Sequence, residues 1–206
     1  MPLDPKIKRD VLASLELYEG RSTHLYLDTL GNVTVGVGHF VANRGAIVSV
    51  QLYKKDAQGN NVVASLAEKQ AEYDNIARQS YGVSFAAGYY KQFTKLFMLN
   101  IDIDAQREAH LKSFFKELAG YYNVANGFKS DFENMPLEVQ KALFDMVFNV
   151  GLPSLISGFP QLDKAIKTEQ WDVAANQCSR KGLSPARNSY CKNLFNLAHN
   201  LSATVP

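Results

Sequence analysis

Two carboxylates and a hydroxyl occur within 16 residues of one another in the stretch E-G-R-S-T-H-L-Y-L-D-T-L-G-N-V-T-V-G-V-G-H, residues 19–39. Glu19 falls at the end of an expected helix, and Asp28 falls in the turn of an expected hairpin, so the two acids can face each other. Hydrolysis of a glycosidic bond needs such a pair, because one acid protonates the leaving oxygen while the other activates water. The residue types therefore favour glycoside hydrolysis.

The surroundings of the two acids are expected to differ in the way this chemistry requires. Glu19 ends an apolar helix and is followed by Gly20, a typical C-terminal cap, so partial burial suits it for the protonated role. Asp28 lies in a polar turn, which suits it for the ionised role.

Strand alternation in V-T-V-G-V-G should separate an apolar face from a face with little side-chain bulk. The valines are Val33, Val35 and Val37, and the other face carries Thr34, Gly36 and Gly38. A hydroxyl beside two glycines on the same face suits a surface where a sugar chain lies close and a water is held.

The combined pattern E-G, D-T-x-G and T-x-G-x-G-H resembles the glycoside hydrolase family 24 lysozymes of the T-even phage type. By this resemblance Glu19 corresponds to the general acid, Asp28 to the second carboxylate and Thr34 to the water-positioning threonine. His39 corresponds to the histidine that closes the motif. The resemblance extends in order over roughly residues 4–40 and 84–200.

Each of these residues also has a purely structural interpretation. A glutamate before a helix-ending glycine is commonly a solvated surface residue, and D-T-x-G is commonly just a turn. A threonine in a strand can simply reflect β-propensity. Their joint order and spacing favour the functional interpretation of Glu19, Asp28 and Thr34.

The resemblance implies a muramidase that cleaves the β-1,4 bond between N-acetylmuramic acid and N-acetylglucosamine in bacterial peptidoglycan, with inversion. Inverting enzymes separate their two carboxyl groups by roughly 6.5–9.5 Å. Such an enzyme needs no metal or organic cofactor.

Two residues in the C-terminal half are further candidates for substrate binding or for positioning the acid. Asn149, near the end of an apolar helix, matches an amide that faces the cleft in relatives, although a local cap is an equally good interpretation. Arg187 matches an arginine directed towards the catalytic glutamate. A cation favours the ionised acid, so its role is positioning; the alternative is a solvated arginine on a helix.

The expected fold is mostly α within the α+β class: one two-lobed, lysozyme-like domain over residues 1–206. It comprises an N-terminal lobe (about 1–83, with a hairpin and an insertion at 41–83), a connecting helix (about 84–118) and a helical C-terminal lobe (about 119–206). Asp4 and Pro5 should begin the first helix. The remaining elements are expected as a second strand pair (46–53 with 62–63), helices from Ser65, from Ser84 and from the cap Asn134, a packing face on Trp171, Ala174, Ala175 and Cys178, and a last helix from Ser184.

Composition is ordinary for a folded protein, with 46% hydrophobic and 20% charged residues and a net charge of +2. Without a dense Lys/Arg stripe, nucleic acid is not an expected partner; a bacterial wall is. We expect a monomer without membrane insertion. The N-terminus lacks the apolar core of a signal peptide, so delivery to the periplasm would depend on holin-dependent release or on a secretion system.

Cys178 and Cys191 leave two interpretations open: a disulfide formed in an oxidising compartment, or two buried, inert thiols. Their spacing does not suit zinc.

The same chemistry would serve two kinds of lytic protein. One is a phage endolysin, and the other is the lytic domain of an antibacterial, pesticin-like toxin or effector, for which an immunity or inhibitor protein is the expected partner. Two rival functions differ in what happens to the glycan: a catalytically silent module would only bind it, and a chitin-cleaving glycosidase would cut a different polymer.

Overall fold

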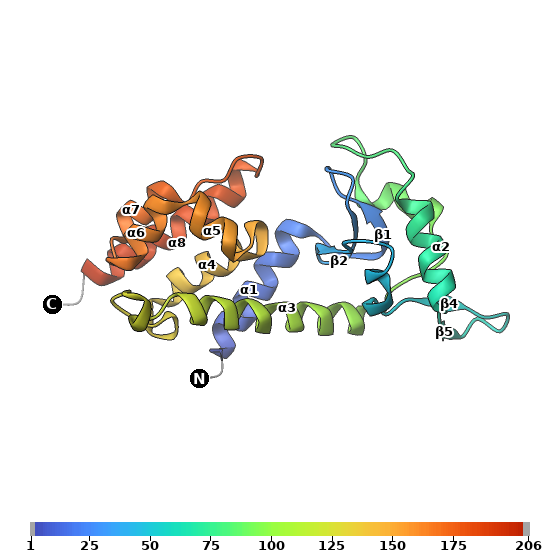
Figure 1. Ribbon diagram of the computed structural model, residues 1–206, viewed down its shortest axis with the longest axis horizontal. Coiled ribbons are helices and arrows are strands. Elements are labelled where there is room, and N and C mark those ends of the chain that lie inside the picture. The colour runs from blue at the N-terminus through green and yellow to red at the C-terminus, as the bar shows by residue number, and fades with distance from the viewer. Residues whose placement is uncertain (1–2, 204–206) are drawn as a thin grey trace. The chain divides into compact units, whose positions relative to one another are not determined.

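The computed structural model describes residues 3–203, of which about 60% are helical, together with two small antiparallel sheets. This confirms the expected mostly-α member of the α+β class (Figure 1). The chain forms two compact units, an N-unit (Glu19–Glu108) and a C-unit (Met1–Tyr18 with Ala109–Pro206). Each unit has its own hydrophobic core. No helix within residues 3–203 combines the length and apolar character needed to cross a membrane.

Helix α1 (Pro5–Glu19) begins and ends where the sequence predicts. The Asp4 carboxylate accepts a hydrogen bond from the Lys6 main-chain N–H (2.7 Å), which satisfies one of the free donors at the helix start. The helix ends at Glu19 because Gly20 takes a left-handed conformation, with φ +72°. Glu19 is thereby fixed at a helix terminus.

The sheet of the N-unit has three antiparallel strands in the order β1 (Ser22–Leu27), β2 (Val33–Gly36) and β3 (His39–Phe40). Tyr26 pairs with Thr34 across β1 and β2, and Leu27 pairs with Val33. The three valines are buried as expected, but Thr34 is also only 4% exposed, so both faces of β2 are covered.

A second antiparallel pair, β4 (Tyr53–Lys55) with β5 (Asn61–Val63), confirms the expected hairpin, but the expected start of its first strand at Ala46 is wrong. A 3-10 helix, η1 (Ala46–Ser49), occupies that stretch. The Asn43 side chain accepts hydrogen bonds from the N–H groups of Gly45 (2.9 Å) and Ala46 (3.0 Å), which favours a turn over a strand.

Helix α2 (Leu66–Ile76) confirms the helix expected from Ser65. Ser65 is its N-cap, and Glu68 completes a capping box by accepting a hydrogen bond from the Ser65 N–H (2.9 Å).

The expected helix from Ser84 to about residue 118 is wrong in its first half. A 3-10 helix, η2 (Ala87–Phe93), is followed by an extended segment, and α3 (Asn100–Tyr121) begins only after it. Asp102 therefore lies in the first turn of α3.

Hydrogen bonds to distant residues hold the segment before α3 extended. Tyr53 and Phe97 exchange both main-chain hydrogen bonds (2.7 and 2.8 Å). The Glu72 carboxylate accepts hydrogen bonds from the N–H groups of Lys95 (2.6 Å) and Leu96 (2.9 Å). These contacts use donors that a helix would have needed, so distant residues determine the structure of this segment.

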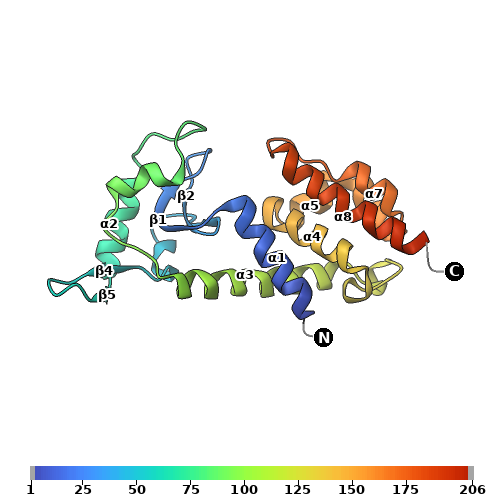
Figure 2. The same cartoon turned by 180° about the vertical axis from the view of Figure 1, so that it is seen from behind.

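In the C-unit, helix α4 (Leu137–Val150) is largely buried and packs against α8 (Pro185–Ala203). The packing of α7 and α8 against each other is visible in both views (Figures 1 and 2). The remaining bounds are η3 (Val124–Asn126), η4 (Phe132–Asn134), α4 (Leu137–Val150), α5 (Leu152–Gly158), α6 (Pro160–Lys167), α7 (Trp171–Gln177) and α8 (Pro185–Ala203). The expected apolar face of Trp171, Ala174, Ala175 and Cys178 is buried.

The expected cap of α4, Asn134, is wrong, because that residue ends η4 and α4 starts after Pro136. Proline disfavours helical geometry in the residue before it, and Met135 is extended (φ −67°, ψ 155°). The end of α4 at Gly151 and the Ser184 cap of α8 are confirmed.

Candidate active site

The candidate residues divide between the two units. Glu19, Asp28, Thr34 and His39 belong to the N-unit, in which Glu19, Asp28 and His39 are half-buried and Thr34 is buried. Asn149 and Arg187 belong to the C-unit and are described separately below.

The turn between β1 and β2 fixes the carboxylate of Asp28. Its Oδ1 accepts hydrogen bonds from the main-chain N–H groups of Leu30 (2.8 Å) and Asn32 (2.9 Å), and its Oδ2 accepts one from the Asn32 side-chain amide (2.9 Å). A carboxylate has about four acceptor positions, so these three bonds leave about one for another donor. A water molecule is a donor of the right size.

Asn32 also connects Asp28 with Thr34. The Thr34 hydroxyl donates to the Asn32 carbonyl oxygen (3.1 Å), and the same carbonyl accepts the main-chain N–H of Asp28 (3.0 Å). Because the hydroxyl proton is used in this bond, Thr34 offers only acceptor lone pairs to a third group. Sequence reasoning missed Asn32, although G-N after D-T-L was a visible turn signal.

Tyr26 lies near both carboxylates. Burial raises the pKa of its phenol to about 12, and the negative charges of Glu19 and Asp28 act in the same direction. Tyr26 also stands opposite Thr34 in the sheet. One side chain is thus within electrostatic range of both predicted acids, and its residue is paired with the predicted hydroxyl residue in the sheet.

The hydrogen-bond pattern of the Asp28 turn occurs a second time in the chain. In D-A-Q-G-N, Asp56 accepts hydrogen bonds from the N–H groups of Gln58 (2.9 Å) and Asn60 (2.8 Å) and from the Asn60 amide (3.1 Å). These bonds hold the pKa of Asp56 below its usual value. The turn geometry is therefore general, and what distinguishes Asp28 is that its charge, like that of Glu19, acts on the Tyr26 phenol.

His39 lies in β3, directly opposite Val35 of β2. Its neighbour Phe40 stands opposite Thr34. His39 therefore flanks the strand that carries Thr34, which is a position suited to support of that strand.

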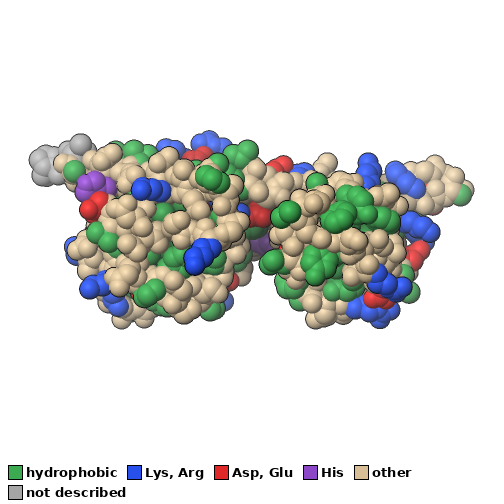
Figure 3. All heavy atoms as spheres, turned by 90° about the horizontal axis from the view of Figure 1, so that it is seen from above, with side chains coloured by type: hydrophobic (Ala, Val, Ile, Leu, Met, Phe, Trp, Pro, Cys, Tyr) green, Lys and Arg blue, Asp and Glu red, His purple; other side chains and the backbone are tan. Residues whose placement is uncertain are grey.

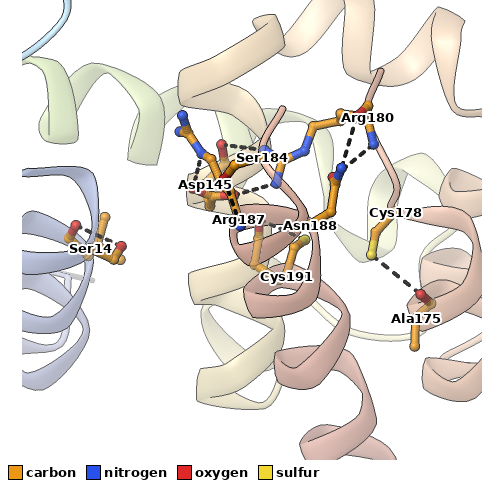
Figure 4. A network of polar contacts seen from close by, with 11 residues as sticks. Ser14, Asp145, Ala175, Cys178, Arg180, Ser184, Arg187, Asn188 and Cys191 are labelled. Atoms are coloured by element: carbon orange, nitrogen blue, oxygen red, sulfur yellow. Dashed lines mark hydrogen bonds and ion pairs between the residues drawn. The ribbon is translucent and has the colours of Figure 1, made fainter. Parts of the chain in front are cut away.

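Arg187 in the C-unit takes part in a buried ionic network. Its Nε donates to Asp145 Oδ1 (3.1 Å), while Arg180 donates to Asp145 Oδ2 (2.6 Å) and to the Asp145 carbonyl (3.1 Å) (Figure 4). The Arg187 guanidinium also lies 5.5 Å from the centre of the Tyr18 ring, a cation–π contact. Arg187 is 5% exposed, so its interpretation as a solvated helix arginine is wrong.

Sequence reasoning missed Asp145 and Arg180, although an aspartate inside the apolar helix segment 137–150 was a visible anomaly. Asn149 lies half-buried in the last turn of α4, two residues before the helix-ending Gly151. Both the cap and the substrate-binding interpretations of Asn149 remain predictions.

Cys178 and Cys191 are free, buried thiols. The Cys178 thiol donates to the Ala175 carbonyl (3.4 Å) and the Cys191 thiol to the Ala142 carbonyl (4.0 Å). Interaction between the two thiols lowers the pKa of Cys178 and raises the pKa of Cys191. The expected free, buried thiols are confirmed, whereas their inertness and their oxidation to a disulfide both remain predictions.

No family model and no curated protein matches this chain.

Proposed function

We propose that this protein is a muramidase that hydrolyses the β-1,4 bond between N-acetylmuramic acid and N-acetylglucosamine in bacterial peptidoglycan. The observation that carries the proposal is the arrangement of Glu19 and Asp28, whose charges both act on the Tyr26 phenol, with Thr34 opposite Tyr26. Two acids beside a positioned hydroxyl are the parts that acid–base hydrolysis of a glycoside needs.

In this mechanism Glu19 protonates the leaving glycosidic oxygen, and Asp28 removes a proton from the attacking water. The remaining acceptor position of Asp28 takes one water hydrogen and a Thr34 lone pair takes the other. With both hydrogens so engaged, a lone pair of the water oxygen is directed at the anomeric carbon. Attack opposite the departing oxygen inverts the configuration of that carbon.

The proposal includes a two-lobed, lysozyme-like architecture and the supporting roles that the family resemblance gives to His39, Asn149 and Arg187. It places the enzyme's action at the cell wall, after release as an endolysin or delivery as an effector. Lys and Arg side chains are dispersed over the visible face in Figure 3, so recognition of the wall is assigned to sugar contacts and not to a basic stripe.

Analysis of the released fragments tests the bond that is cleaved. Purified peptidoglycan is digested, the new reducing ends are reduced with borohydride, and the fragments are weighed by mass spectrometry. Reduced N-acetylmuramic acid ends are the expected result. Reduced N-acetylglucosamine ends would contradict the muramidase assignment, and cleavage of chitin alone would favour a chitin-cleaving glycosidase.

The stereochemistry has its own test. Proton NMR during early digestion is expected to show the α-anomer first, because the cleaved β-bond is inverted. An initial β-anomer would show retention and would remove Asp28 from the water-activating role.

A further inference from the structure

A cavity of about 810 Å³ lies in the N-unit, among β4, α2 and the extended segment before α3. None of Glu19, Asp28 and Thr34 belongs to its lining, so it is distinct from the candidate active site. Its walls combine three lysines, two phenylalanines and two glutamates.

Glu72, a residue of this lining, has one buried carboxylate oxygen that lacks a partner among the described residues. Glu72 is 7% exposed, and its Oε2 accepts the N–H groups of Lys95 and Leu96. Its Oε1 is buried and has no hydrogen-bond partner among residues 3–203. A buried polar atom left in this state costs about 1–3 kcal/mol, so a ligand hydroxyl or amide that donates to Oε1, once the Glu72 side chain turns this oxygen towards the cavity, would be stabilised.

The three lysines differ in whether their ammonium groups already have partners within the protein. Lys54 is paired with Glu68, and that ion pair contributes to lowering the pKa of Glu68 to about 2. Lys55 donates to the Gly59 carbonyl (2.9 Å). Lys95 is exposed, and its charge acts on Glu72. Lys95 is therefore the cation best placed to receive an anionic group of a ligand.

Phe93 and Phe97 are half-buried and supply the aromatic part of the wall. The Lys55 ammonium lies over the Phe97 ring, 5.8 Å from its centre, so the opposite face of the ring is the one offered to a ligand. An aromatic face suits the C–H face of a sugar ring, while hydroxyl donors suit Glu72 Oε1 and a carboxylate suits Lys95. We propose that this cavity binds an acidic saccharide, with a ring hydroxyl on Glu72, the carboxylate on Lys95 and the ring against Phe97. N-acetylmuramic acid carries all three features.

The cavity extends the proposed function, because it would bind an acidic sugar of the cell wall at a place other than the cleavage site. The choice of N-acetylmuramic acid as its ligand rests on the proposed muramidase function. Binding to the cavity is measurable without turnover. A cavity that does not bind the sugar can therefore be distinguished from a protein that does not hydrolyse peptidoglycan.

The test is a titration of the full chain, uniformly labelled with ¹⁵N, followed by two-dimensional NMR. The probes are N-acetylmuramic acid, N-acetylglucosamine, which lacks the lactyl carboxylate, and D-lactate, which lacks the ring. Saturable shifts of the Lys95, Leu96 and Phe97 amides with N-acetylmuramic acid, and weaker binding of the other two, are the expected result. Equal binding of either control, or shifts confined to residues 28–39, would overturn the proposal.

A matched pair of lysine variants tests whether the carboxylate of N-acetylmuramic acid binds at Lys95. Lys95→Gln should weaken N-acetylmuramic acid binding about two- to fivefold, the range of a partly exposed ion pair. Lys91→Gln removes the same charge from η2, outside the lining, and should leave the affinity unchanged. Unchanged affinity in Lys95→Gln, with the spectrum otherwise native, would remove Lys95 from the site and overturn the proposal.

Discussion

Asn32 donates two hydrogen bonds to the carboxylate of Asp28, one from its main-chain N–H and one from its side-chain amide, each 2.9 Å long. Its carbonyl accepts the hydroxyl of Thr34 (3.1 Å). One residue in a tight turn therefore orients both groups that the proposed mechanism assigns to the attacking water. The relationship can be tested because the chain contains a second turn of the same construction.

Asp28→Asn should lower turnover of peptidoglycan by about 10²–10⁴-fold, because an amide cannot accept a proton from water. Asp56→Asn alters the matching turn between β4 and β5 and should leave turnover unchanged. Both rates are measured by release of reducing sugar, with thermal melts to show that the two variants lose similar stability. Equal turnover in the two variants would count against a chemical role for Asp28.

Thr34→Val keeps the shape of the side chain but removes its hydroxyl. The loss of the bond to Asn32 should cost about 1 kcal/mol of unfolding free energy, and turnover should fall by roughly tenfold or more because the water loses one acceptor. Thr168→Val is the matched control, since the Thr168 hydroxyl donates to the Lys164 carbonyl (3.0 Å) in the C-unit. Wild-type turnover in Thr34→Val would remove this residue from the mechanism.

The Tyr26 phenol reports on the two acids. Glu19→Gln should lower the pKa of Tyr26 from about 12, because a negative charge that opposes phenolate formation is removed. NMR of ¹³Cζ-labelled tyrosine, assigned with Tyr26→Phe, measures the shift. An unchanged pKa would mean that Glu19 lies too far from Tyr26 to act beside Asp28.

The same phenol predicts a loss of stability in alkali. The folded pKa of Tyr26, about 12, exceeds the usual value near 10, so this contribution to stability is complete below about pH 10. It is lost as pH rises from about 10 to 12, because the unfolded chain releases the proton first. Urea unfolding across this range should show a smaller decline in Tyr26→Phe than in wild type.

The buried network of the C-unit should matter more to stability than a comparable surface network. Asp145→Asn leaves Arg180 and Arg187 without their carboxylate and should cost about 3–5 kcal/mol of unfolding free energy. Asp104 also pairs with two arginines but is half exposed, so Asp104→Asn should cost about 0–1 kcal/mol. Equal losses in urea unfolding would contradict this reasoning.

The sequence predicted well those elements whose signals are local. Asp4, Pro5 and Gly20 determine α1 through capping geometry, and D-T-L-G-N determines the turn that holds Asp28. It failed where distant residues decide the local structure. The extended segment before α3 depends on Tyr53 and Glu72, which are far away in the sequence.

The residues of the candidate site were likewise predictable where the signal is local and were missed where it depends on distant residues. Glu19, Asp28 and Thr34 could be proposed from a short motif because they lie within one helix–hairpin stretch. Tyr26 was missed because its relevance comes from burial and from two charges, neither of which its own sequence position reveals. Arg180 was missed because it lies in the segment between α7 and α8, and its partner, Asp145, is 35 residues earlier, in α4.

The most direct test of the central claim is the loss of turbidity of purified peptidoglycan with wild type, Glu19→Gln and Glu117→Gln side by side. Glu117 lies in α3, where it accepts a hydrogen bond from Ser113, and provides the matched substitution. Clearing by wild type and Glu117→Gln but not by Glu19→Gln is the predicted result. Equal clearing by all three proteins would show that Glu19 is not the acid, and clearing by none would favour a glycan-binding module.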